Sequence, residues 1–239
     1  IRDRWMLSPV GVWGNPCDIG YTIDSIPGAM TLRELTEAGL NHVSRRSPDR
    51  FFMMIEGGNI DHAAHANDPG GVIKEIINFQ EAIKVAHDFY LAHPDETLIV
   101  VTADHDTGGM ALAYKTRGGL ALIDNQRISK DLLTDHCRDL LEKNIPVTWE
   151  EMKSLLTDKL GFWSAVKLSD KETEKIKESF DRTFIDRSGH NEKALYNVYN
   201  AFVVEVFGIY NKHVGTAFIN NSHTCLLYTS PSPRDMRRS

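Results

Sequence analysis

The chain has 239 residues, 41% of them hydrophobic, which is enough to bury one sizeable core. Its formal net charge of −6 argues against nucleic acid as a binding partner, because surfaces that bind nucleic acid are basic. No stretch approaches the roughly 20 apolar residues that a membrane-spanning helix requires, so no membrane span is predicted in this sequence.

The two ends of the sequence differ from its middle. The chain begins with Ile1 and not with Met, which indicates a cut inside a longer chain. Residues 225–239, CLLYTSPSPRDMRRS, continue no earlier pattern and resemble the translation of a common sequencing-library adapter. We therefore interpret residues 225–239 as an artefactual tail. The two cysteines outside it, Cys17 and Cys137, are expected to be unpaired core residues or a single bridge.

A strand, a helix and a second strand are predicted near the centre of the chain. Thr31–Glu34 is a capping box that begins an earlier helix. Residues 51–55 form an unbroken apolar run, typical of a strand buried on both faces. Apolar residues then recur at helical spacing from Val72 to Tyr90, and residues 97–102 predict the second strand. A crossover of this length makes the two strands parallel.

The second half of the sequence predicts mainly helices. Residues 110–114 are a candidate strand, and two further capping boxes begin at Thr148 and Ser169. Asn191 is expected to cap a long helix that continues to Val206, and residues 213–219 to return as a short strand. Residues 128–212 contain no cluster of acidic residues and histidines, so we interpret them as a helical cap.

Acidic residues and histidines follow each of three predicted strands. Because the carboxyl ends of parallel strands share one edge of a sheet, these side chains are expected to converge. An aspartate and a histidine four residues apart can hold one ion on a helical turn, and zinc accepts both. A single such pair is usually a solvated helix face, but two clusters at adjacent strand ends favour a metal site. The residues are Glu56, Asp61, His62, His65, Asp104, His105 and His223.

Together these elements predict an α/β fold, part of a three-layer α/β/α sandwich with a mostly parallel central sheet and a helical cap insertion. Residues 1–127 would form the metal-binding half of the core and residues 128–212 the cap. Residues 213–224 would supply the returning core strand and the last metal ligand, ahead of the tail at 225–239.

Three segments of this sequence resemble alkaline phosphatases, over roughly residues 20–224. They are EGGNIDHAAH at 56–65, TADHDTGG at 102–109 and SHT at 222–224. The resemblance implies that Asp61, His65 and His223 hold one zinc ion, Asp104 and His105 a second, and Glu56 a magnesium ion. His62 falls where the family has a variable residue near the bound phosphate, and an exposed loop histidine is an equally open interpretation.

The resemblance implies hydrolysis of phosphate monoesters through a phosphoserine intermediate, in a periplasmic or secreted protein that is usually a homodimer. No Asp-Ser-Ala nucleophile segment is present, since Asp24-Ser25 precedes Ile26-Pro27, a turn. We therefore expect the chain to be inactive alone. The alternatives are a phosphodiesterase, sulfatase or phosphoglycerate mutase of the same superfamily, or a non-catalytic metal-binding module. Glu56 favours the monoesterase.

Overall fold

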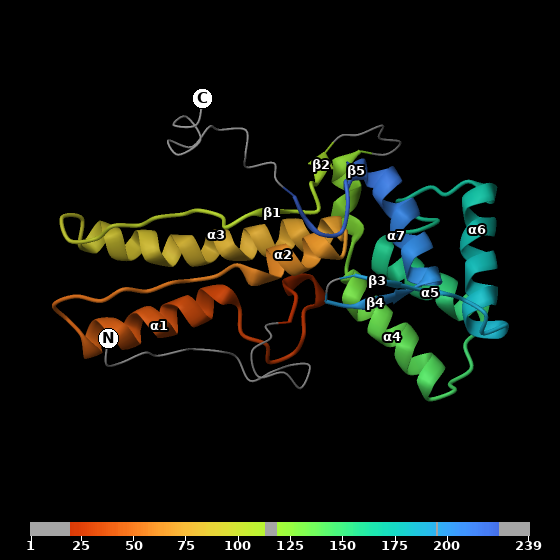
Figure 1. Ribbon diagram of the computed structural model, residues 1–239, viewed down its shortest axis with the longest axis horizontal. Helices are drawn as coiled ribbons and strands as arrows, with labels where there is room; N and C mark the ends of the chain where they lie inside the picture. The colour runs from red at the N-terminus through yellow and green to blue at the C-terminus, as the bar shows by residue number, and fades with distance from the viewer. Residues whose placement is uncertain (1–19, 113–118, 195, 225–239) are drawn as a thin grey trace, which may run out of the picture. The chain divides into compact units, whose positions relative to one another are not determined.

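The computed structural model describes residues 20–112, 119–194 and 196–224, which divide into two compact units (Figure 1). The first unit contains described residues up to Ile60 and residues 71–102. The second contains residues 61–70 and the described residues from 103 onward. Two helices, α2 (Gly58–His65) and α3 (Pro69–Ala92), contribute residues to both units. No helix in these described ranges combines the length and apolar character needed to cross a membrane.

The first unit pairs α1 (Leu32–Arg46) with α3, after a short 3-10 turn η1 (Thr22–Asp24). The predicted capping box at the start of α1 is confirmed, because the Thr31 hydroxyl accepts from the Glu34 amide and the Glu34 carboxylate accepts from the Thr31 amide. Arg33 lies 3.3 Å from Glu81 and so links α1 to α3. The helix predicted between residues 72 and 90 is likewise confirmed as α3.

The two segments predicted as buried strands belong to no strand of the first unit in the described residues. The Phe51 ring packs edge-on against Phe89 of α3, with centroids 5.7 Å apart. Their other face is open, since Phe52 and Leu98 are 88% and 86% exposed. Burial on both faces is therefore wrong for these segments, because a strand gains its second apolar face and its ladder of hydrogen bonds only beside a neighbouring strand.

Strand pairing in the described residues is limited to three two-stranded antiparallel sheets. They pair β1 (Asp106–Thr107) with β6 (His223–Thr224), β2 (Ala111–Leu112) with β5 (Thr216–Ala217), and β3 (Asn191–Lys193) with β4 (Val198–Asn200). The mostly parallel sheet expected from the sequence is not present among them. Of the candidate strand at 110–114, Ala111 and Leu112 form β2. Residues 113 and 114 lie outside the described range.

The second unit is built around α7 (Ala201–Val214), which is the most buried helix of the chain. Helices α4 (Lys130–Glu142) and α6 (Asp170–Phe180) and the 3-10 turn η2 (Leu120–Asn125) pack against it, and α5 (Trp149–Leu160) and the π-helical turn η3 (Asp181–Ile185) complete the unit. The capping boxes predicted at Thr148 and Ser169 are confirmed at the starts of α5 and α6. The core is aromatic and aliphatic: Phe162, Phe180, Phe202, Val206, Phe207 and Tyr210 are almost fully buried.

The long helix predicted from Asn191 is wrong for the positions before Ala201, where α7 begins. Residues 191–200 form the β3–β4 hairpin, and α7 begins at the N-cap Asn200, whose side chain accepts from the Val203 amide. A distant partner decides this local structure, because the Tyr199 hydroxyl donates to Asp131 of α4 at 2.7 Å while its ring is buried. The strand expected at 213–219 is also shortened, since α7 continues to Val214 and only Thr216–Ala217 pair.

Cys137 on α4 is buried and unpaired, and burial raises the pKa of its thiol to about 12, partly offset by a hydrogen bond with Asn200. Cys17 lies outside the described residues. In the unfolded chain a thiol titrates near about 8.5, so above that pH the unfolded state releases a proton that the folded state keeps. Stability therefore falls as pH rises, by about 1.4 kcal/mol per pH unit from this residue.

Between pH 8.5 and pH 10, we expect the free energy of unfolding in urea to fall further for the wild type than for Cys137→Ala. The difference between the two falls should be about 2 kcal/mol. The alanine variant should be less stable at pH 7, because it leaves a small cavity. Parallel pH profiles for the two proteins would contradict the assignment of this titration to Cys137.

Candidate metal centre

The centre of the site is the last turn of α2, which carries Asp61 and His65 on one face. Their spacing of four residues brings Asp61 Oδ1 within 3.4 Å of His65 Nε2. The His65 side chain is only 2% exposed, and its Nδ1 lies 2.7 Å from the Asn221 carbonyl oxygen. That carbonyl can only accept, so Nδ1 carries a proton, and in the neutral tautomer Nε2 is the nitrogen available to a metal ion.

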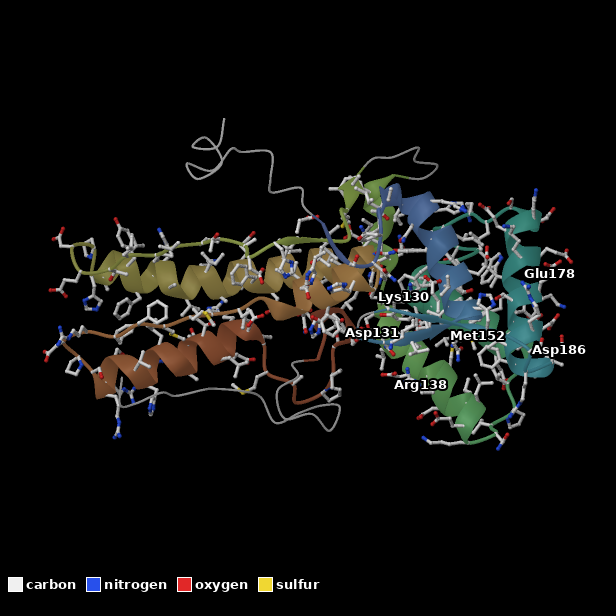
Figure 2. The ribbon with its side chains drawn as sticks, viewed as in Figure 1. Lys130, Asp131, Arg138, Met152, Glu178 and Asp186 are labelled. Atoms are coloured by element: carbon white, nitrogen blue, oxygen red, sulfur yellow. The ribbon has the colours of Figure 1, made fainter. Side chains whose placement is uncertain are left out.

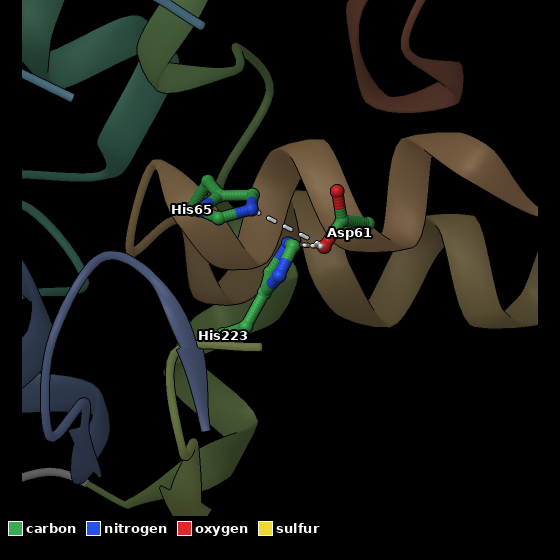
Figure 3. Close-up of side chains that lie close together, drawn as sticks. All are labelled: Asp61, His65 and His223. Carbon is green, nitrogen blue, oxygen red and sulfur yellow. Dashed lines mark ion pairs between the residues drawn. The ribbon is translucent and has the colours of Figure 1, made fainter. Parts of the chain in front are cut away.

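His223 joins this pair through the antiparallel ladder of β1 and β6, where it lies opposite Thr107. Its Nε2 is 4.0 Å from Asp61 Oδ1, and its ring centroid is 5.0 Å from that of His65 (Figure 3). One ligand atom from each of the three residues lies within 4.8 Å of the others. The structure therefore brings His223 to Asp61 and His65, although more than 150 positions separate it from either residue.

The donor set fits a zinc ion on an observation independent of the family. His65 Nε2 is buried and makes no hydrogen bond, although Asp61 Oδ1 lies 3.4 Å away. A buried nitrogen without a partner is costly, and a metal ion supplies that partner. Two imidazoles and a carboxylate are ligands that zinc accepts together.

Gly108, in the turn directly after β1, packs closely against α2. Gly108 has a φ of +73°, and a Cβ there would lie 2.9 Å from the Ala64 carbonyl oxygen. Its amide donates to the Ser222 carbonyl at 2.9 Å, and its own carbonyl accepts from the Ile219 amide at 2.8 Å. Both the backbone conformation and the space exclude a side chain, so His223 reaches Asp61 only with glycine at this position.

Asp104 and His105 lie beside the cluster in the same unit. The His105 ring stacks on His223 with centroids 3.7 Å apart. Asp104 Oδ2 lies 3.3 Å from His105 Nε2, and Asp104 is 86% exposed. The side chains of Asp104 and His105 therefore lie close to each other, and that of His105 lies against His223. That Asp104 and His105 bind a second metal ion stays a prediction.

Thr107 is a site residue that the sequence did not reveal. Its hydroxyl donates to Asp61 Oδ1 at 2.5 Å and lies 3.2 Å from His105 Nδ1. Since the hydroxyl proton is used on Asp61, His105 Nδ1–H donates to the hydroxyl oxygen, and in the neutral tautomer this leaves Nε2 available to a metal ion. The only sequence signal was its place directly after the Asp104-His105-Asp106 run, at a strand position that faces His223.

Replacing Thr107 with valine removes this hydroxyl and keeps the volume of the side chain. We expect zinc affinity to fall about tenfold, because groups that orient metal ligands contribute roughly 10- to 100-fold. Thr107→Ser, which keeps the hydroxyl, should bind zinc nearly as the wild type does. Competition with a chromogenic chelator measures both, and equal affinities for the valine and serine variants would show that the hydroxyl has no such role.

A buried polar network holds the carboxyl end of α2 in place. Asp68 accepts from Gln126 Nε2 at 2.6 Å and from the Lys130 backbone amide at 2.8 Å. The Lys130 ammonium donates to the Ala66 carbonyl at 2.9 Å, one residue after His65. All three side chains are buried, and burial lowers the pKa of Lys130 against the opposing attraction of Asp68. Lys130, labelled in Figure 2, thus ties α4 to the helix that carries the ligands.

The comparisons with known proteins agree on one family. The family model described as alkaline phosphatase matches residues 11–196. The chain belongs to the alkaline phosphatase family. Alkaline phosphatase 3 of Bacillus subtilis is 40% identical over 112 residues, which are 46% of this chain and 23% of that protein. The repressible alkaline phosphatase of Saccharomyces cerevisiae is 36% identical over 99 residues, 39% of this chain and 18% of that protein.

Two solved alkaline phosphatases share the fold of this chain. The cold-active alkaline phosphatase from the psychrophile Shewanella sp. has a TM-score of 0.64 at 24% identity, covering 86% of this chain and 44% of that chain. The Thermus thermophilus alkaline phosphatase has a TM-score of 0.60 at 23% identity, covering 85% and 43%. The fold class is therefore α/β. This chain spans less than half the length of either structure.

Two predicted residues of this alkaline phosphatase chain lie outside the cluster. Glu56 belongs to the first unit, directly before α2, and its magnesium role stays a prediction. The His62 ring lies against the Tyr196 ring at a tilt of 42°, with centroids 4.2 Å apart, and its contact with phosphate also stays a prediction. Tyr196 is a second residue that sequence analysis missed, because it lies in the segment interpreted as a cap without site chemistry.

Proposed function

We propose that this chain supplies the metal-binding part of an enzyme that hydrolyses phosphate monoesters. One observation carries the proposal: Asp61, His65 and His223 converge around a buried, unpartnered histidine nitrogen in a member of the alkaline phosphatase family. Asp61, His65 and His223 would hold one zinc ion, Asp104 and His105 a second, and Glu56 a magnesium ion. When bound, such ions neutralise phosphate charge and stabilise the attacking and leaving oxygens of an in-line displacement.

Neighbouring groups of this chain would orient the histidine ligands. The Asn221 carbonyl fixes the tautomer of His65, and the Thr107 hydroxyl fixes that of His105, so that each presents a bare nitrogen. The chain is acidic overall, so bound cations would supply the positive charge that attracts a phosphate. The nucleophilic serine, which would form the phosphoserine intermediate, would come from a segment that this sequence does not contain.

We also infer that residues 51–55 and 97–102 become neighbouring parallel strands of a three-layer α/β/α sandwich in the complete protein. Their exposed apolar side chains support this, because the side chains of strands in parallel sheets are buried on both faces. Residues 128–212 would then be the helical cap insertion of that sandwich. Export to the periplasm or outside the cell, and a homodimer, belong to the same proposal.

The test measures release of a chromogenic alcohol from its phosphate ester, with zinc and magnesium added. The 239-residue chain alone should show no turnover, whereas the chain joined to the preceding half of its own reading frame should hydrolyse the ester. Asp61→Ala and His105→Ala in the joined protein should abolish turnover, and Asp158→Ala, an exposed aspartate on α5, should not. Turnover by the chain alone that survives both substitutions would overturn the proposal, as would an inactive joined protein that binds zinc.

A further inference from the structure

We propose that Tyr196, at the tip of the β3–β4 hairpin, is a positioning residue of the metal centre that fixes the Asp61 carboxylate and the His62 ring. The inference rests on the proposed metal site and assigns a role to a segment outside the ligand motifs. It also gives the block at 128–212 a direct part in the site, where the sequence predicted none.

Tyr196 contacts three residues of α2 at once. Its hydroxyl lies 3.4 Å from Asp61 Oδ2, and its ring meets His62 at 4.2 Å with an interplanar angle of 42°. The same ring meets His65 edge-on, with centroids 5.1 Å apart. Because Asp61 Oδ1 faces Thr107, His65 and His223, the two carboxylate oxygens are engaged on different sides. The phenol therefore restricts rotation of the Asp61 carboxylate and keeps Oδ1 towards the histidines.

The hairpin tip is held by α4, so the position of Tyr196 does not depend on its own contacts. The neighbouring residue Asn197 accepts from Arg138 Nη2 and donates to Asp131 Oδ1, each at 2.8 Å. Asp131 also accepts from the Tyr199 hydroxyl at 2.7 Å. Asp131 and Arg138 lie on α4 (Figure 2), which makes that helix the support of the tip.

Close to its turn, the hairpin packs against the end of the ligand-bearing helix. Ala194 and Tyr199 form a buried cluster with Ala66, the residue after His65, and Val204 of α7 covers it. The Lys130 ammonium lies 4.3 Å above the Tyr199 ring and donates to the Ala66 carbonyl. The hairpin is therefore joined to α2 and the residue after it by apolar contacts as well as by the ring of Tyr196, in one compact unit.

The hydroxyl and the ring of Tyr196 have separable roles. The hydroxyl acts on Asp61 and should affect metal affinity, because partners that orient a ligand contribute roughly 10- to 100-fold. The ring acts on His62 and should set the orientation of that imidazole at the rim of the site. Tyr196 is 56% exposed, so substitution removes few packing contacts and should leave the fold intact.

The experiment measures zinc affinity of the 239-residue chain by competition with a chromogenic chelator. Tyr196→Phe, which removes only the hydroxyl, should weaken zinc binding about tenfold. Tyr196→Leu should weaken it at least as much. Tyr90→Phe, the same change at a tyrosine on α3 whose ring contacts His87, is the matched control and should leave zinc affinity unchanged.

The His62 ring provides a readout that does not involve metal affinity. The NMR shift of its Hε1 proton should be alike in the wild type and Tyr196→Phe and should move in Tyr196→Leu, because only the leucine variant loses the ring current. Asn197→Ala should loosen the tip, and combined with Tyr196→Phe it should cost less than the sum of the two single changes.

Two failures are distinguishable. A wild-type chain that binds no zinc overturns the proposed metal function and this inference with it. Zinc binding by the wild type that is unchanged in both Tyr196 variants overturns this inference alone.

Discussion

Asp61→Ala should weaken zinc binding by more than about 100-fold, beyond the 10- to 100-fold that loss of an orienting partner costs. Asp61 is the only carboxylate among the three converging ligands, and its Oδ1 lies within 4.0 Å of both histidine nitrogens. Its removal leaves two neutral imidazoles, which hold zinc poorly without a third ligand. Chelator competition on the 239-residue chain measures the change.

Two further variants make this result specific. Asp158→Ala removes a carboxylate from an exposed position of α5 and should leave zinc affinity unchanged. Asp61→Asn keeps the size of the side chain and should lose most of the affinity as well, because an amide is a weaker donor to zinc. Near wild-type affinity in Asp61→Ala would show that zinc binds elsewhere on the chain.

Asp68→Ala should lower the free energy of unfolding by about 3–5 kcal/mol. The substitution removes the acceptor of the Gln126 side chain and of the Lys130 backbone amide, and it leaves the buried Lys130 ammonium without its nearest counter-charge. Urea unfolding at pH 7 measures the loss. Asp158→Ala should change it by less than about 0.5 kcal/mol.

The pH dependence of this loss identifies its cause. Burial lowers the pKa of Lys130 in the folded state, so in the window between that pKa and about 10.4 the unfolded state binds more protons and stability rises with pH. Without Asp68 the folded pKa falls further and the window widens. The difference between Asp68→Ala and the wild type should therefore shrink as pH rises, and a constant difference would place the cause outside Lys130.

The sequence predicted those features that depend on interactions between residues close together in the chain. The capping boxes at Thr31, Thr148 and Ser169 each join a side chain to a backbone amide three residues away, so the pattern contains the whole interaction. The helical spacing of apolar residues between Val72 and Tyr90 likewise predicts α3 without reference to any distant residue. The convergence of Asp61 and His65 follows from a spacing of four residues, and His223 was placed with them by its position after a predicted strand.

Distant partners decide what the sequence could not predict. Thr107 and Asp61 are 46 residues apart, and Tyr196 and Asp61 are 135 apart, so no short pattern contains either hydrogen bond. The hairpin at 191–200 has apolar spacing compatible with a helix, but Asp131 draws Tyr199 and Asn197 into an extended pair. The segments at 51–55 and 97–102 have the composition of strands in a sheet. Composition does not show whether a neighbouring strand is present to pair with them.

If zinc binds as proposed, the buried Nε2 of His65 would couple zinc supply to the lifetime of the folded chain. An unsatisfied buried nitrogen costs the apo protein roughly 1–3 kcal/mol, and zinc at 100 times its dissociation constant returns about 2.7 kcal/mol by mass action. A protease that cleaves the unfolded form would then degrade the chain about 100 times more slowly in excess zinc than in its absence. Zinc starvation would thus deplete the protein itself and not only its metal content.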